Sequence, residues 1–153
     1  METMKIMLVD DEERFLSTTL KLLTKKGIDA VTAASGAEAL EKLNHKHIHV
    51  VILDVKMPGM DGNETLKEIK KRFPLVEVIM LTGHATVESA IDGLKSGATD
   101  YLMKPTEIDE LIAKAREAFQ KRLQLEEKIH MAQSRKYMKS PREILKEAEK
   151  PER

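Results

Sequence analysis

Four short apolar runs in the sequence each end in side chains that could take part in chemistry. These side chains, each with the run that it follows, are Asp10 and Asp11 (5–9), Asp54 (50–53), Thr82 (77–81) and Lys104 (100–103). Neighbouring carboxylates repel one another unless a cation lies among them, and carboxylate oxygens with spare water positions suit Mg²⁺. With a hydroxyl and an ammonium beside that cation, the set could clamp a phosphoryl group for attack by a carboxylate oxygen. We expect Asp54 to be this nucleophile, because it follows the most apolar run, which is typical of a central strand.

Each of these residues also has an ordinary structural interpretation. An aspartate after a strand often forms a turn or caps the next helix. For Asp11, which precedes the segment EERFL, capping alone remains open. The combination still favours a site, because suitable groups follow four different strands and none of them is chemically out of place.

The segments that must position these groups alternate between strand-like and helix-like patterns. The pattern predicts strands at 5–9, 29–34, 50–53, 77–81 and 100–103, and helices at 13–23, 36–43, 63–72, 86–96 and from 108 onward. Ser35 should cap the second helix, with Glu38 completing a capping box. Apolar strands separated by helices predict a parallel sheet covered on both faces, in an open, doubly wound α/β domain. Ligands of such sheets bind beyond the carboxyl ends of the strands.

Composition narrows the class of protein further. The 153 residues suffice for one domain, and 26 basic and 26 acidic side chains cancel, so no net charge favours nucleic acid or an anionic membrane. Cysteine and Trp are absent, which excludes disulfides and thiol chemistry and argues against a base-stacking surface. No G-x-G-x-x-G, Walker or signal-peptide pattern is present. We therefore expect a cytoplasmic protein that binds neither a membrane nor nucleic acid directly.

The segments VDDE (9–12), LDVKMPGMDG (53–62), LTGHA (81–85) and YLMKP (101–105) together form a specific signature. With them, residues 4–122 resemble the receiver domain of two-component response regulators, the CheY-like family. The resemblance implies a flavodoxin-like, five-stranded parallel sheet in the order 2-1-3-4-5. It also implies that Asp54 accepts a phosphoryl group from a sensor histidine kinase or a phosphotransfer protein.

The same resemblance implies a Mg²⁺ site. Its ligands would be Asp11, Asp54 and the backbone carbonyl of Lys56, and Asp10 would support the metal through water. Such a domain is a phosphorelay acceptor rather than a conventional enzyme, with slow intrinsic autodephosphorylation. Side chains at Lys56 and His84 are expected to flank the path of the hydrolytic water and to tune the lifetime of the phosphoryl group; two solvated loop residues are the alternative.

Further residues would carry the switch. In the family, the residue at the Thr82 position moves to bond the phosphoryl oxygen, and the aromatic at the Tyr101 position swings inward with it. Lys104 would contact the phosphoryl group, and the peptide bond before Pro105 is expected to be cis. At Gly83, a side chain could crowd a phosphoryl group beside Thr82. A partner would then read the surface formed by the helix at 86–96, the strand at 100–103 and the helix from 108.

Two other functions agree with parts of the sequence. The sequence of residues 81–105 is similar to that of NtrC-type receivers. The chain could therefore be the receiver portion of a transcriptional activator that lacks its output domain. A phosphohydrolase of the haloacid-dehalogenase type also forms an aspartyl-phosphate, but it needs a second aspartate two residues after the nucleophile. Here that position holds Lys56, which argues against the phosphohydrolase.

Two regions lie outside these motifs. His45, His47 and His49 alternate in a segment expected to be a solvated loop, with a metal site as the less favoured alternative. The pattern of the last helix continues past the receiver, interrupted only by Arg122, so 123–153 is predicted to extend that helix and end in a charged tail. A homodimer could form through this extension or through the surface that the partner would read.

Overall fold

The computed structural model describes residues 3–55, 61–83 and 87–137. The chain separates into two compact units, Met1–Arg122 and Leu123–Arg153. The last helix contributes to both units, and its part beyond Arg122 is the only segment of the second unit that the structure describes. Within the described ranges, no helix has the length and apolarity needed to cross a lipid bilayer.

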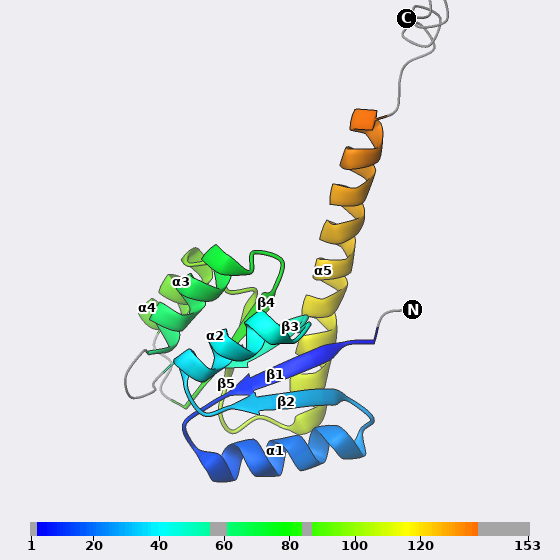
Figure 1. Ribbon diagram of the computed structural model, residues 1–153. Coiled ribbons are helices and arrows are strands. Elements are labelled where there is room, and N and C mark those ends of the chain that lie inside the picture. The colour runs from blue at the N-terminus through cyan, green and yellow to red at the C-terminus, as the bar shows by residue number, and fades with distance from the viewer. Residues whose placement is uncertain (1–2, 56–60, 84–86, 138–153) are drawn as a thin grey trace, which may run out of the picture. The chain divides into compact units, whose positions relative to one another are not determined.

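Strands and helices alternate along the first unit (Figure 1). The strands are β1 (Lys5–Val9), β2 (Asp29–Ala33), β3 (Val50–Leu53), β4 (Glu77–Thr82) and β5 (Asp100–Met103). The helices are α1 (Glu13–Lys25), α2 (Gly36–His45), α3 (Gly62–Arg72), α4 (Val87–Lys95) and α5 (Ile108–Tyr137). All strand pairs are parallel, and the sheet has the order β2-β1-β3-β4-β5. The predicted doubly wound fold and its long C-terminal helix are therefore confirmed.

The core explains why the strands are almost continuously apolar. Alternate residues of a strand face opposite sides of the sheet, and here both sides are covered, by α2, α3 and α4 on one face and by α1 and the start of α5 on the other (Figure 1). One buried cluster joins strand residues to α2 and α3, and its members include Met7, Val9, Val51, Leu53, Val78, Met80, Leu40, Leu43, Leu66 and Ile69.

The strand register brings the carboxyl ends together at one edge of the sheet. Val9 pairs with both Ala33 and Leu53, and Leu53 pairs with Met80. The ladder continues beyond the strands, because Asp10 N–H donates to the Ala33 carbonyl (3.1 Å) and Asp54 N–H donates to the Val9 carbonyl (2.9 Å). The backbones of these two aspartates are thus fixed by the sheet itself.

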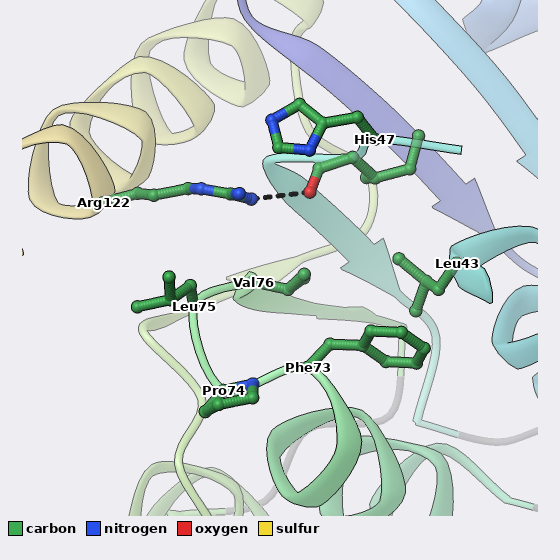
Figure 2. Close-up of a pocket in the computed structure, with 8 residues that line it drawn as sticks. Leu43, His47, Phe73, Pro74, Leu75, Val76 and Arg122 are labelled. Atoms are coloured by element: carbon green, nitrogen blue, oxygen red, sulfur yellow. Dashed lines mark hydrogen bonds between the residues drawn. The ribbon is translucent and has the colours of Figure 1, made fainter. Parts of the chain in front are cut away.

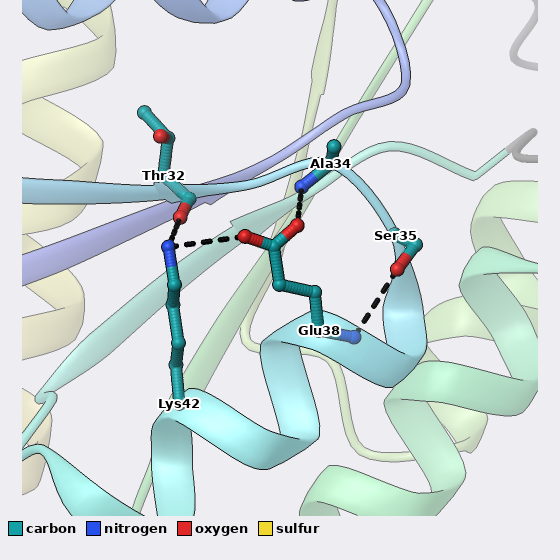
Figure 3. Close-up of polar contacts among 5 residues, drawn as sticks. All are labelled: Thr32, Ala34, Ser35, Glu38 and Lys42. Atoms are coloured by element: carbon teal, nitrogen blue, oxygen red, sulfur yellow. Dashed lines mark hydrogen bonds and ion pairs between the residues drawn. The ribbon is translucent and has the colours of Figure 1, made fainter.

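The end of β2 leads into a capped helix (Figure 3). Ser35 Oγ accepts a hydrogen bond from Glu38 N–H (3.1 Å), as the sequence predicted. The Glu38 carboxylate reaches back to Ala34 N–H (2.7 Å), one residue earlier than in a standard capping box. Lys42 completes the group: its ammonium donates to the Thr32 carbonyl and lies 3.1 Å from Glu38 Oε1.

The expectation of a solvated histidine loop was wrong for His49. Its side chain is 2% exposed, and its Nδ1 accepts a hydrogen bond from Lys5 N–H (3.0 Å). The ring meets His47 and Phe119 edge to face, with centroids 4.7 and 4.9 Å away. His45 instead closes α2, and the three histidines form no three-ligand metal group in the described part of the chain.

Arg122 does not interrupt the packing of α5, contrary to the interpretation of the sequence. Its side chain is 5% exposed, and Nη1 donates to the Ile48 carbonyl at 2.6 Å (Figure 2). Arg122 and Ile48 line a shallow cavity of about 250 Å³ with Phe73, Val76 and other apolar residues. The sequence places a charge at a core position, and the structure satisfies it with a backbone carbonyl.

Candidate functional site

Three carboxylates converge beyond the adjacent strands β1 and β3. One oxygen from each of Asp10, Asp11 and Asp54 lies within 4.8 Å of the others. Asp10 is 1% exposed and Asp54 is 7% exposed, whereas Asp11 faces solvent. Carboxylates this close, two of them removed from water, repel one another and favour a bound cation.

Asp10 already has two partners. Its Oδ1 accepts a hydrogen bond from Glu12 N–H (2.9 Å), which closes the turn before α1, and its Oδ2 lies 2.5 Å from Lys104 Nζ. The residue at the start of α1, Glu12, makes no side-chain cap. Asp10, rather than Asp11, therefore organises the entry into α1, and the capping role that the sequence left open for Asp11 is not found.

Lys104 places a positive charge beside the carboxylates at the carboxyl ends of the strands. The ladder between β4 and β5 continues to it, because Lys104 N–H donates to the Thr82 carbonyl (2.9 Å). Its ammonium lies 2.5 Å from Asp10 Oδ2, 3.9 Å from Glu12 Oε1 and 4.2 Å from the ring centroid of Phe15. The bond from Lys104 to Pro105 is cis, as predicted. The ends of β1 and β5 thus meet through the contact between Asp10 and Lys104, and the backbone of Lys104 joins them to the end of β4.

Thr82 and Tyr101 occupy the β4 and β5 positions predicted for the switch. Thr82 is the last residue of β4 and is 1% exposed. Tyr101 is half-buried against the apolar cluster, and a Cβ placed on Gly93 of α4 would lie 3.9 Å from its ring. Among the residues that the structure describes, a Cβ on Gly83 would contact only Lys104 Cβ, at 3.9 Å, so this part of the chain leaves space there. Crowding of a phosphoryl group at Gly83 stays a prediction.

A glycine that the sequence analysis did not single out also shapes the site. A Cβ on Gly62 would lie 2.2 Å from the Asp54 carbonyl oxygen and 2.5 Å from Val55 Cα, so any side chain there would clash with the backbone. Gly62 N–H donates to the Val55 carbonyl (2.9 Å), and Asp61 caps α3 by accepting from Glu64 N–H (2.9 Å). The Asp-Gly pair after the MPGM segment was the available signal, because it is typical of close backbone approach.

The ion pair of Asp100 and Lys114 ties β5 to α5. The Lys114 ammonium lies 2.9 Å from Asp100 Oδ2. Burial raises the pKa of Asp100, but hydrogen bonds from Lys114 and from Tyr101 N–H outweigh it and leave that pKa below its ordinary value. The hydrogen bond to Asp100 raises the pKa of Lys114. This pair keeps the two elements together beside the switch positions.

Lys56 and His84 lie outside the described residues, so their predicted roles stay predictions. Among the described residues, the remaining donor set fits Mg²⁺. It consists of carboxylate oxygens only, which hard divalent cations prefer, and Asp11 faces solvent, which leaves room for water ligands.

Comparison with known proteins agrees with this arrangement. Residues 6–116 match the family described as the response regulator receiver domain. Residues of this chain are 41% identical over 106 positions to the DNA-binding transcriptional regulator NtrC of Klebsiella pneumoniae, covering 69% of this chain and 23% of that protein. A putative NtrX-like response regulator of Rickettsia bellii is 40% identical over 114 residues, covering 73% and 24%. The chain thus spans about a quarter of the length of these relatives.

Solved structures show the same fold. A CheY-like receiver domain protein from Methanospirillum hungatei superposes with a TM-score of 0.76 at 31% identity, covering 80% of this chain and 98% of the other. The receiver domain of NtrX from Brucella abortus gives 0.71 at 34%, covering 75% and 98%. NtrX from the same organism gives 0.78 at 30%, covering 91% of this chain and 32% of that one. By its motifs, its sheet and the matched family, the chain belongs to the response regulator receiver domains.

Proposed function

We propose that the protein is a phosphorylation switch in which Asp54 accepts a phosphoryl group from a phosphohistidine, with Mg²⁺ as cofactor. The observation that carries this proposal is the convergence of three carboxylate oxygens within 4.8 Å beside a lysine ammonium. In the transfer, a bond forms between an Asp54 oxygen and phosphorus while the bond from phosphorus to the donor nitrogen breaks. The donor would be a sensor histidine kinase or a phosphotransfer protein.

Asp54 is favoured over its neighbours by its surroundings. Asp10 is already held by Lys104 and by Glu12 N–H, and Asp11 faces solvent at the rim. Asp54 is buried and follows the central strand, and its backbone is fixed by the ladder to Val9. A nucleophile needs this kind of fixed placement, because orientation supplies much of the rate of a transfer.

The groups around Asp54 match the charge that develops in the transfer. Mg²⁺ bound by Asp11, Asp54 and the Lys56 carbonyl, with Asp10 acting through water, would neutralise the phosphoryl oxygens and the carboxylates together. Lys104 would move its ammonium from Asp10 toward the phosphoryl group, and Thr82 would donate its hydroxyl to it. Lys56 and His84 would set how fast water releases the group.

The output surface would be the face formed by α4, β5 and the start of α5. Large apolar side chains are exposed there, at Ile91 (44%), Leu94 (48%) and Met103 (55%). Tyr101 belongs to β5, which is part of this face, so an inward movement of Tyr101 with Thr82 would reshape the face. We propose that a downstream protein, or a second copy of the chain, reads this surface in the cytoplasm.

A second candidate is the receiver portion of a larger transcriptional regulator. The lengths of the aligned segments favour this candidate: the 106 residues matched to NtrC make up only 23% of that relative. The match to NtrX of Brucella abortus extends to 91% of this chain, against 75% for the match to its receiver domain alone. In this proposal residues 4–122 are the receiver and residues 123–153 are an extension that links or dimerises it. The genomic reading frame that follows Arg153 distinguishes the two.

Incubation with acetyl phosphate and Mg²⁺, followed by intact-mass measurement, tests the phosphorylation. We expect the gain of one phosphoryl group that is labile to base, and no gain when Mg²⁺ is chelated. Asp54→Asn should abolish the gain, whereas the matched variant Asp61→Asn, at the helix cap of α3, should keep it. A full gain in Asp54→Asn would refute the assignment of the phosphoacceptor.

A further inference from the structure

One aromatic side chain contacts a charged group of the site. Phe15 lies in the first turn of α1, is half-buried, and is not a member of the buried apolar set that contains its neighbour Leu16. Side chains of a helix lean toward its N-terminus, and for α1 that direction leads to the edge where Asp10 lies. Phe15 is therefore placed by the helix at the rim of the carboxylates.

The ring of Phe15 meets the ammonium of Lys104. Lys104 Nζ lies over the ring face, 4.2 Å from the centroid, and 2.5 Å from Asp10 Oδ2. The face of an aromatic ring is electron-rich and attracts a cation. Phe15 and Asp10 thus hold the same ammonium from two sides, one through the ring and one through a carboxylate.

We propose that Phe15 is a positioning residue that keeps Lys104 on Asp10 in the metal-free site and thereby opposes Mg²⁺ binding. The proposal rests on the proposed function in that it takes Mg²⁺ to be the cofactor. The ammonium neutralises the carboxylates that a divalent cation would neutralise, so the two cations compete for the same negative charge. A contact that stabilises Lys104 in this place weakens Mg²⁺ binding by the part of its free energy that is lost when Mg²⁺ binds.

The size of the effect follows from the contact. A cation–π contact at a partly exposed position changes an equilibrium by about two- to fivefold. Phe15→Leu removes the ring face and keeps an apolar helix-forming side chain, so it should lower the Kd for Mg²⁺ by about two- to fivefold. Phe15→Tyr keeps the ring face and should leave the Kd unchanged.

Calorimetric titration of the full chain with MgCl₂ tests this, with urea unfolding of each variant as the folding control. The double-mutant cycle with Lys104→Ala is decisive. Lys104→Ala alone should tighten Mg²⁺ binding, and adding Phe15→Leu should then change nothing. An unaltered Kd in Phe15→Leu, or the same gain with and without Lys104, would overturn the role of Phe15.

A second readout needs no metal. In the metal-free protein, the ring should shift the NMR resonances of the Lys104 ε-methylene upfield; Phe15→Leu should lose this shift and Phe15→Tyr should retain it. Absence of the shift in the wild type would overturn the contact itself. Wild type that shows the shift but binds no Mg²⁺ would refute the cofactor assignment and the competition with it. Mg²⁺ binding that is indifferent to Phe15 would refute only the inference.

Discussion

Charged side chains are buried at both ends of the parallel strands, but their hydrogen-bonding and ionic partners differ between the two ends. At the carboxyl end, the Asp10 carboxylate meets the Lys104 ammonium, with Asp54 beside it. At the amino end of the strands, Arg122 donates to the carbonyl of Ile48 (Figure 2). His49 accepts a hydrogen bond from the backbone N–H of Lys5. The Asp10–Lys104 ion pair thus joins two side chains, whereas the hydrogen bonds of Arg122 to Ile48 and of Lys5 to His49 each join a side chain to the backbone.

This difference distinguishes a contact that can change, between Lys104 and Asp10, from one that holds a helix in place, between Arg122 and Ile48; we call the second the anchor. A backbone carbonyl has a fixed place and no charge to exchange, so Arg122 holds α5 in one position against the start of β3. A lysine on a carboxylate can be replaced by another cation, because the incoming cation again neutralises the carboxylate. Strand β3 joins the two ends, since it begins directly after His49 and ends directly before Asp54.

The largest expected effect is on the anchor. Arg122→Met should lower the free energy of unfolding by about 2 kcal/mol, because it removes a buried hydrogen bond from a charged donor and leaves the Ile48 carbonyl unpaired. Arg116→Met, an exposed position on the same helix, should change it by about 0.5 kcal/mol or less. Urea unfolding measures both. Arg122→Met should still gain a phosphoryl group from acetyl phosphate. Loss of that gain in a folded variant would contradict the claim that Arg122 has a structural role only.

Addition of Mg²⁺ tests the carboxylate cluster through a gain, rather than a loss, of stability. At about ten times its Kd, Mg²⁺ should raise the free energy of unfolding by about 1.4 kcal/mol, because only the native site binds it. Asp11→Asn, at an exposed ligand position, should remove this gain without unfolding the protein. The comparison is made by urea unfolding against NaCl of equal ionic strength. Equal stabilisation by the two salts would contradict a specific site.

The carboxyl end of β2 contributes a helix cap rather than a member of the carboxylate cluster. β2 leads to Ser35, whose hydroxyl caps α2 and takes no part in the carboxylate cluster. Ser35→Ala should lower the free energy of unfolding by about 1 kcal/mol and leave phosphoryl gain intact. Ser17→Ala, exposed within α1, is the matched control and should have little effect on stability. A large loss of phosphorylation in Ser35→Ala would extend the switch to β2.

The smallest effect is a pH dependence at the same cap. The Ala34 N–H that donates to Glu38, together with Lys42, outweighs burial and holds the pKa of Glu38 below its ordinary value of 4.5. A lowered pKa in the folded state stabilises the protein above the unfolded-state pKa, and this stabilisation fades as the pH falls through the folded value. Wild type should therefore exceed Glu38→Gln in unfolding free energy near neutral pH, and the two should converge below about pH 4.5. A gap that stays constant down to acid pH would exclude the carboxylate as its source.

Much of this architecture was predictable from local pattern. Apolar runs and helical spacing gave all five strands, and the rule that ligands bind at carboxyl ends brought Asp10, Asp54 and Lys104 together. The Ser35 cap was also predicted correctly. These features are local, or they follow from the topology of parallel sheets. The cis bond before Pro105 was predicted correctly as well, but from the resemblance to the receiver family.

What the sequence could not supply were contacts between distant segments. Arg122 and Ile48 are 74 residues apart, and Lys5 and His49 are 44 apart, so nothing in the local pattern showed that either charged or polar side chain would be buried. Phe15 carries no signal in the sequence beyond its apolar character, because only the fold places Lys104 over its ring. Polar groups that are satisfied by the backbone leave no signature in a hydrophobicity pattern.

The central claim is that Asp54, among three clustered carboxylates, takes the phosphoryl group. Its most direct test is to react the protein with acetyl phosphate and Mg²⁺, reduce it with sodium borohydride, and sequence the peptides by mass spectrometry. Borohydride converts an aspartyl-phosphate to homoserine. The account predicts homoserine at position 54 and at neither position 10 nor position 11. Homoserine at either of those two positions, or unmodified peptide at position 54 from a protein that had gained the phosphoryl mass, would contradict it.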